Sequence, residues 1–98
     1  MIFGGTGNDT IFGNQNNDEI YGEGGNDVIF GNDGSDEIRG GTGNDSLAGG
    51  NGNDQIFGDT GQDTLAGGQG SDALDGGGGI DTAIDFGELL HINIEFSP

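Results

Sequence analysis

The chain lacks cysteine and lysine altogether, and it contains one proline, one histidine and one arginine. Without cysteine it forms neither disulfides nor thiolate metal sites. Its single basic residue, Arg39, stands against 18 acidic residues, and the formal net charge is −17 at pH 7. Nucleic acids and anionic membranes are bound through Lys and Arg, so neither is expected as a partner. A surface of this charge attracts cations instead.

Hydrophobic residues are also scarce, at 29% of the chain, whereas 25 residues are glycine. This composition is typical of disordered segments rather than of an ordinary globular core. No apolar run is long enough to span a membrane, and no N-terminal stretch has the pattern of a signal peptide. The chain has no lysine for a phosphate loop, no cysteine nucleophile and no EF-hand loop, and its lone histidine, His91, lies in an alternating polar and apolar stretch. We therefore do not expect an enzyme.

What the chain has in abundance is one repeated unit. From residue 4 to residue 84 it divides into nine consecutive units of nine residues, without insertion or deletion. The units are GGTGNDTIF, GNQNNDEIY, GEGGNDVIF, GNDGSDEIR, GGTGNDSLA, GGNGNDQIF, GDTGQDTLA, GGQGSDALD and GGGGIDTAI. Position one is always glycine, position six is always aspartate, and position eight is Ile or Leu in every unit except the last, which has Ala83. Residues 1–3 match the end of a unit, so we expect one repeat domain over residues 1–84, followed by a separate segment over 85–98.

Each recurrent position has a physical reason. Glycine at position one, and usually at two and four, predicts positive φ angles in a tight loop. Asn14, Asn16 and Asn32 replace glycine with the residue that best tolerates such angles, whereas Glu23 and Asp59 are less comfortable there. Positions seven to nine predict a three-residue strand whose middle side chain points inward. One apolar residue per strand then supplies a thin core between two sheets.

The units resemble the RTX, or haemolysin-type calcium-binding, repeat GGxGxDxUx, in which U is a large aliphatic residue. The resemblance covers residues 4–84 in perfect phase and implies an all-β fold, a right-handed parallel β-roll. Two repeats form one turn, with six-residue loops on both edges and three-residue strands between them. The resemblance places Ca²⁺ between loops of repeats i and i+2, bound by the position-six aspartates and by carbonyl oxygens of positions one to four. Such hard oxygen ligands suit Ca²⁺.

On one edge, the implied aspartate ligands are Asp9, Asp27, Asp45, Asp63 and Asp81, and on the other Asp18, Asp36, Asp54 and Asp72. Consecutive aspartates define four sites on the first edge and three on the second. The loop residues implied as carbonyl ligands are Gly4, Thr6, Gly13, Gln15, Gly22, Glu23, Gly24, Gly25, Gly31, Asn32, Asp33, Gly34, Gly40, Gly41, Thr42, Gly43, Gly49, Gly50, Asn51, Gly52, Gly58, Asp59, Thr60, Gly61, Gly68, Gly70, Gly77 and Gly79.

Seven divalent ions would bring the formal charge from −17 to −3. Without them, neighbouring aspartates repel, and one apolar residue per strand cannot offset the entropy of ordering a glycine-rich backbone. We therefore expect a chain that is unfolded in low-calcium cytosol and folds where calcium is abundant. The resemblance implies a secreted bacterial module, exported by a type I apparatus as part of a larger protein, that assists secretion and extracellular folding.

Two surface patterns leave alternatives open. Tyr21, Arg39 and Phe57 at position nine line up on one sheet, which predicts a cross-strand ladder or, as a second interpretation, a binding face for a glycan or a neighbouring domain. A row of Thr6, Thr42 and Thr60, beside a row of Asn residues at position five, resembles RTX ice-binding adhesin modules. That Thr row is interrupted by glycine. A surface adhesin or ice-binding module is therefore the alternative function.

The last segment leaves the repeat. In residues 90–96, apolar and polar residues alternate, which predicts a half-buried strand. We expect the segment 85–98 to cap the end of the roll, since the ends of solenoids need protection. A C-terminal export signal is the alternative interpretation.

Overall fold

The computed structural model describes residues 1–84 and 90–93, which contain short strands and no helix. Each predicted nonapeptide supplies one strand from its last three or four residues. The strands are β1 (Ile2–Phe3), β2 (Thr10–Phe12), β3 (Glu19–Tyr21), β4 (Val28–Phe30), β5 (Glu37–Arg39), β6 (Ser46–Ala48), β7 (Gln55–Phe57), β8 (Thr64–Ala66), β9 (Asp72–Asp75), β10 (Thr82–Ile84) and β11 (Leu90–Asn93).

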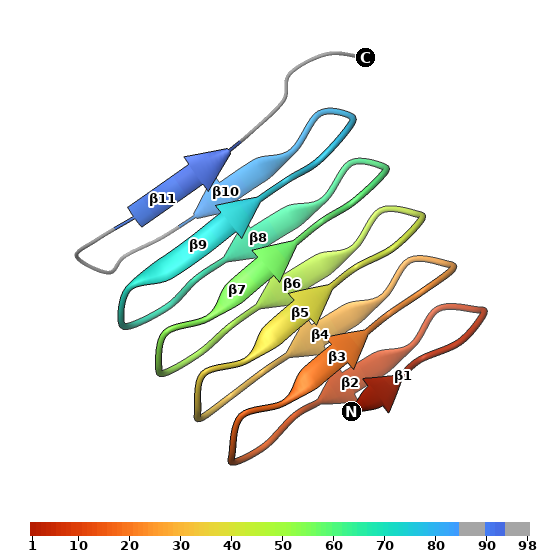
Figure 1. The fold of residues 1–98 in the computed structure, drawn as a ribbon. Helices are drawn as coiled ribbons and strands as arrows, with labels where there is room; N and C mark the ends of the chain where they lie inside the picture. Colours follow the sequence, from red (N-terminus) through yellow and green to blue (C-terminus); the bar gives the residue numbers. More distant parts are fainter. Residues whose placement is uncertain (85–89, 94–98) are drawn as a thin grey trace.

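The strands form two parallel sheets that the chain visits alternately. One has the order β1-β3-β5-β7-β9-β11, and the other has the order β10-β8-β6-β4-β2. Residues 18 apart are paired throughout, as in Ile20 with Ile38 and Ile29 with Leu47. In Figure 1 the front strands run to the right, the chain crosses behind, returns, and advances by one strand. This winding is right-handed, so the predicted right-handed β-roll with two repeats per turn is confirmed.

The core is a single file of position-eight side chains between the two sheets. Ile20, Ile29, Ile38, Ile56 and Leu65 have no exposed surface, and Leu47 and Leu74 are 2% exposed. Ile11, in the first full repeat, is 8% exposed. Ile2 and Ala83 pack against the two ends of this file. The core is therefore one side chain thick, as the repeat predicts, and the loops on both edges enclose it.

The outer faces carry aromatic contacts from position nine. Tyr21 stacks on Phe3 with ring centroids 5.1 Å apart, and Phe12 stacks on Phe30 at 5.2 Å. The guanidinium carbon of Arg39 lies 4.3 Å from the ring centroid of Phe57. Of the predicted ladder, Arg39 contacts Phe57, whereas Tyr21 stacks on Phe3. These contacts between neighbouring strands stabilise the sheet faces.

The loops use positive φ angles at positions two and four of every repeat, including Asn14, Asn16, Glu23, Asn32 and Asp59. The prediction that position one also needs a positive φ is wrong, because no position-one glycine has one. Space is the reason for glycine there. A β-carbon on Gly40 would lie 2.6 Å from Asp45 Oδ2 and 3.1 Å from the carbonyl oxygen of Gly58. Position one must be glycine because two oxygen atoms converge on that point.

Strand β11 extends the roll by one further strand beyond the nine repeats. It pairs in parallel with β9, with Ile92 opposite Leu74 and His91 opposite Ala73. The predicted strand over 90–96 is therefore found over Leu90–Asn93, and its remainder lies outside the described residues. Most of the predicted capping segment (residues 85–89 and 94–98) also lies outside them, so capping stays a prediction.

Replacing a position-one glycine tests the close approach of oxygen atoms. Gly40→Ala should lower the free energy of unfolding by about 1–3 kcal/mol, since the new methyl group must displace a carboxylate and a carbonyl. Gly78→Ala is the matched control, because Gly78 has no positive φ and no atom within 4 Å of its added β-carbon. Urea unfolding in millimolar calcium, the ligand that the repeat pattern implies, measures both. Equal stability of the two variants would contradict this explanation.

Candidate metal centre

The position-six aspartates form one column along each edge of the roll. Loops 4–9, 22–27, 40–45, 58–63 and 76–81 make the first edge, and loops 13–18, 31–36, 49–54 and 67–72 make the second. From Asp27 onward, every aspartate of both columns is 1–3% exposed. Buried carboxylates are rare in proteins unless they are paired with a cation or hydrogen-bonded.

One oxygen of these carboxylates is used to connect successive coils. The backbone N–H of each aspartate from Asp9 to Asp63 in these columns donates to Oδ1 of the aspartate 18 residues later, as in Asp27 to Asp45 and Asp36 to Asp54, both at 2.8 Å. Seven such bonds, of 2.8–2.9 Å, join the coils, one in each gap between stacked loops. Oδ1 therefore holds the coils in register.

The other oxygen, Oδ2, is buried and finds no hydrogen-bond donor among the described residues. This is so for Asp9, Asp18, Asp27, Asp36, Asp45, Asp54 and Asp63. Each Oδ2 faces the position-one glycine of its own loop, and Asp27 Oδ2 would be 2.7 Å from a β-carbon on Gly22. A buried carboxylate oxygen without a hydrogen-bond donor costs free energy, and its regular recurrence indicates positions that suit a cation.

Main-chain carbonyl groups point into the same gaps from both sides. A β-carbon on Gly43 would collide with the carbonyl oxygen of Gly25, and one on Gly41 with that of Glu23. Carbonyls of positions two and four therefore point toward the following loop. In the opposite direction, the carbonyl oxygen of Gly40 lies 2.8 Å from the place of a β-carbon on Gly22. Every gap thus receives a carbonyl oxygen from position four and an aspartate Oδ2, and most gaps also receive carbonyl oxygens from positions one and two.

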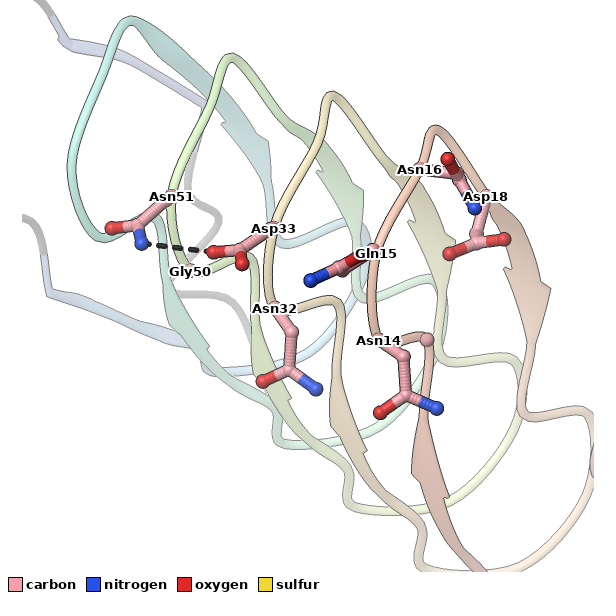
Figure 2. Close-up of a pocket in the computed structure, with 9 residues that line it drawn as sticks. Asn14, Gln15, Asn16, Asp18, Asn32, Asp33, Gly50 and Asn51 are labelled. Carbon is pink, nitrogen blue, oxygen red and sulfur yellow. Dashed lines mark hydrogen bonds between the residues drawn. The ribbon is translucent and has the colours of Figure 1, made fainter.

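Position three belongs to the outer surface of the roll. Its residues lie on the outside of the loops, and those with side chains are exposed, among them Thr6, Thr42 and Thr60. On the second edge they line a shallow polar groove, in which Asn51 Nδ2 donates to Asp33 Oδ1 at 3.0 Å (Figure 2). The structure shows position-three groups in this groove, so their predicted part in metal binding stays a prediction.

The sequence did not predict the structural role of the position-five asparagines, which bond consecutive coils to each other. Its asparagine side chains accept a backbone N–H from the next coil, as Asn8 Oδ1 does from Asn26 and Asn26 Oδ1 from Asn44, both at 2.8 Å. Asn17 and Asn53 do the same on the second edge. The recurrence of Asn at position five was the available signal, but it was interpreted only as part of a possible surface row.

Burial and mutual repulsion dominate the electrostatics of the columns. Burial raises the pKa of Asp45 to about 6 and the pKa values of Asp54 and Asp63 to about 7. Backbone N–H bonds oppose this rise, whereas the charges of neighbouring aspartates add to it. Burial also raises the pKa values of Asp27 and Asp36. The Asp59 charge contributes to the raised pKa of both Asp45 and Asp63.

The chemistry of the donor set fits calcium. In residues 1–84 and 90–93, no three carboxylate or histidine side chains converge on one point, so a cation must rely on main-chain oxygens as well. Carboxylate and carbonyl oxygens in irregular arrangement suit Ca²⁺, whereas Mg²⁺ demands near-octahedral geometry and keeps its waters.

The described residues include no helix that is long and apolar enough to cross a bilayer.

Comparison with known families agrees with this donor set. A family model described as "RTX calcium-binding nonapeptide repeat (4 copies)" matches residues 1–29, 30–65 and 49–83. The chain belongs to the RTX calcium-binding repeat family. Membership implies that it binds calcium and that the roll is a structural module of a kind that is typically not catalytic. RTX repeats occur in secreted bacterial proteins. Searches among curated proteins and among solved structures found no match.

The raised pKa values predict an unusual pH dependence for the metal-free RTX roll. An unfolded chain releases the protons of its aspartates near pH 4, whereas the metal-free fold keeps protons on Asp54 and Asp63 up to about pH 7. The fold therefore binds more protons between these values, and its stability falls as pH rises from 4 to 7. Less osmolyte should fold the calcium-free chain at pH 5 than at pH 8, as measured by circular dichroism.

The double variant Asp54→Asn and Asp63→Asn is the control, because neutral amides of the same shape remove the two titrations. It should need less osmolyte than the parent chain at pH 8 and show a smaller change between pH 8 and pH 5. An osmolyte requirement in the parent chain that rises on acidification would contradict the assignment.

Proposed function

We propose that this RTX roll is a calcium-dependent folding module, in which up to seven ions occupy the gaps between stacked loops. The observation that carries the proposal is the column of buried Oδ2 atoms, which recurs in each gap with carbonyl oxygens beside it. Bound calcium supplies the positive charge that these inward-facing oxygens require. Asp Oδ1 remains free to keep its bond to the neighbouring coil.

The residues that would hold each ion come from two consecutive loops of one edge. In the gap between loops 22–27 and 40–45, they are Asp27 through Oδ2, Glu23 and Gly25 through their carbonyl oxygens, and Gly40 through its carbonyl oxygen. The carbonyl of Glu23 also accepts the N–H of Thr42 at 3.0 Å, so it offers the ion its second lone pair. The same positions of the other loops would hold the remaining ions.

Calcium then determines whether the chain is folded. Without the ion, the roll must keep carboxylates buried and close to one another, and its core is one side chain thick. Ions that bind only the folded chain shift the equilibrium toward the roll by mass action. Calcium sites of extracellular modules bind in the range of roughly 10⁻⁴ to 10⁻³ M. A chain with such sites stays unfolded at cytosolic calcium levels and folds outside the cell.

This switch supports a role in export. An unfolded chain suits passage through a narrow conduit, and folding on the far side prevents its return. We propose that the module is secreted by a bacterial type I apparatus as part of a larger protein, and that it assists the extracellular folding of that protein. Secretion of bacterial RTX proteins in general is consistent with this role.

The adhesin or ice-binding alternative receives no specific support. The Asn row at position five bonds to backbone N–H groups of the next coil, which gives it a structural explanation. The Thr row at position three is exposed but interrupted by Gly24 and Gly78. The cross-strand contacts of Tyr21, Arg39 and Phe57 likewise have a stabilising role without a glycan.

Removal of calcium tests the proposal. With excess chelator at pH 7.5 the chain should lose its β-structure, and millimolar calcium should restore it, as followed by circular dichroism and calorimetric titration. Asp54→Asn should raise the calcium midpoint severalfold, because it keeps an acceptor for the Asp36 N–H and removes only the buried charge. Asp33→Asn is the control, since it makes the same change at an exposed residue of the same edge. Identical spectra with chelator and with calcium would overturn the proposal.

A further inference from the structure

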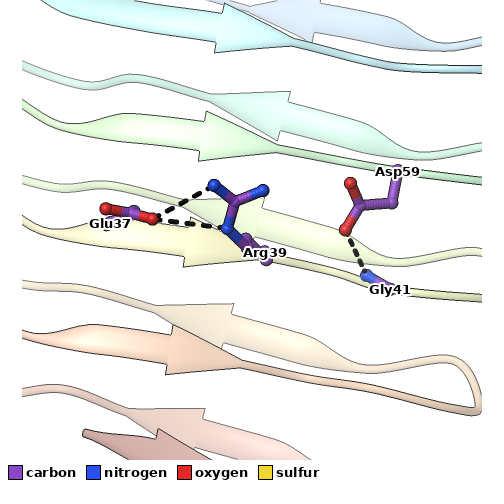
Figure 3. A network of polar contacts seen from close by, with 4 residues as sticks. All are labelled: Glu37, Arg39, Gly41 and Asp59. Carbon is purple, nitrogen blue, oxygen red and sulfur yellow. Dashed lines mark hydrogen bonds and ion pairs between the residues drawn. The ribbon is translucent and has the colours of Figure 1, made fainter.

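One gap on the first edge differs from the others because of the residue at position two. Between loops 40–45 and 58–63, Asp59 occupies a position that is glycine in most repeats, with a φ of 67°. Its Oδ2 accepts the backbone N–H of Gly41 in the preceding loop at 3.2 Å (Figure 3). The Asp59 carboxylate therefore lies across this gap. It adds a third negative charge near those of Asp45 and Asp63, although the three carboxylates do not converge on one point.

The other residues that replace glycine at position two do not have this effect. Asn14 and Asn32 are neutral, and both lie on the second edge. Glu23 carries a charge on the first edge, but it is exposed, whereas Asp59 is half-buried. The charge at position two is thus directed into a gap only where Asp59 lies.

The same gap has independent features of a cation site. Asp45 and Asp63 are 3% and 2% exposed, and their Oδ2 atoms find no hydrogen-bond donor within the part of the chain that the structure describes. A β-carbon on Gly40 would lie within 3.1 Å of both Asp45 Oδ2 and the carbonyl oxygen of Gly58. Carboxylate and carbonyl oxygens from the two loops therefore converge there, beside Asp59.

Among the side chains that the structure describes, no basic group pairs with this carboxylate. Arg39, the only Lys or Arg of the chain, is the nearest candidate, because it immediately precedes loop 40–45. Its Nη2 lies 3.2 Å from Glu37 Oε2, and its guanidinium carbon lies 4.3 Å from the Phe57 ring centroid. Figure 3 shows Arg39 turned toward Glu37, with Asp59 bonded to Gly41. The charge of Asp59 is left for a cation.

We propose that the gap between loops 40–45 and 58–63 binds calcium more tightly than the other gaps, and that the roll begins to fold there. The proposal rests on the proposed calcium function and adds an order of events to it. Calcium affinity increases with the number of charged groups around the site. In a solenoid each coil is stabilised mainly by its neighbours, so folding that starts at one filled gap spreads outward. This gap joins the fifth and seventh of the nine repeats, so coils on both sides can be recruited.

Hydrogen exchange at subsaturating calcium tests this order in the full chain. As calcium is raised, backbone amides of residues 40–63 should become protected first, at about one tenth of the calcium concentration needed for both ends. A factor of about ten is expected for one added charge a few ångströms from a divalent ion in a water-like dielectric. Asp59→Asn should abolish this lead, because it keeps the oxygen that accepts the Gly41 N–H and removes the charge.

Glu23→Gln is the matched control, because it removes one side-chain charge at position two of another loop on the same edge and keeps the main-chain carbonyl of residue 23. It should leave the early protection of residues 40–63 intact. Simultaneous protection of the whole roll, a first appearance elsewhere, or an equal loss of the lead in Glu23→Gln would each overturn the order while leaving calcium-dependent folding in place. Absence of calcium-dependent protection anywhere would overturn the proposed function together with this inference.

Discussion

The buried carboxylate at position six is the interaction on which the rest of the roll depends. Its two oxygens have different tasks. Oδ1 accepts a backbone N–H from the preceding coil, so it keeps consecutive coils in register, as between Asp27 and Asp45 at 2.8 Å. In the seven aspartates from Asp9 to Asp63, Oδ2 faces inward and finds no hydrogen-bond donor among the described residues. The same side chain therefore provides a bond between coils and carries an uncompensated buried charge, which a bound cation neutralises and which a proton neutralises at low pH.

The glycine pattern follows from this arrangement of oxygens. Positions two and four adopt positive φ, which turns their carbonyl groups along the axis of the roll. Position one has ordinary φ but must lack a β-carbon, because Asp Oδ2 and a carbonyl oxygen of the next loop occupy that space. The strands contribute one apolar side chain each, and this thin core sets the distance between the two sheets. The placement of oxygen atoms, the loop shape and the core thickness are thus consequences of one repeat.

Much of the fold could be predicted from the sequence, because every nine-residue unit forms the same loop and the same short strand. Aspartate every nine residues and Ile or Leu two positions later predict strands, core and loop edges, and the structure places Ile38 and Asp36 as expected. The reason for glycine at position one could not be predicted, because it depends on atoms that are brought close only by folding. At Gly40, these are Oδ2 of Asp45 and the carbonyl oxygen of Gly58 in the next coil. The role of Asn26 was missed for the same reason, since its bond spans 18 residues. The gap containing Asp59 became visible only when its contact with Gly41 was known.

Anomalous X-ray diffraction from crystals grown in calcium tests the central claim most directly. Our account predicts calcium peaks between successive loops on both edges, each at about 2.3–2.6 Å from an aspartate Oδ2 and from carbonyl oxygens of two loops. Crystals of the same roll in which calcium lies only against outer carboxylates such as Glu19 and Asp33, with the gaps empty, would contradict it.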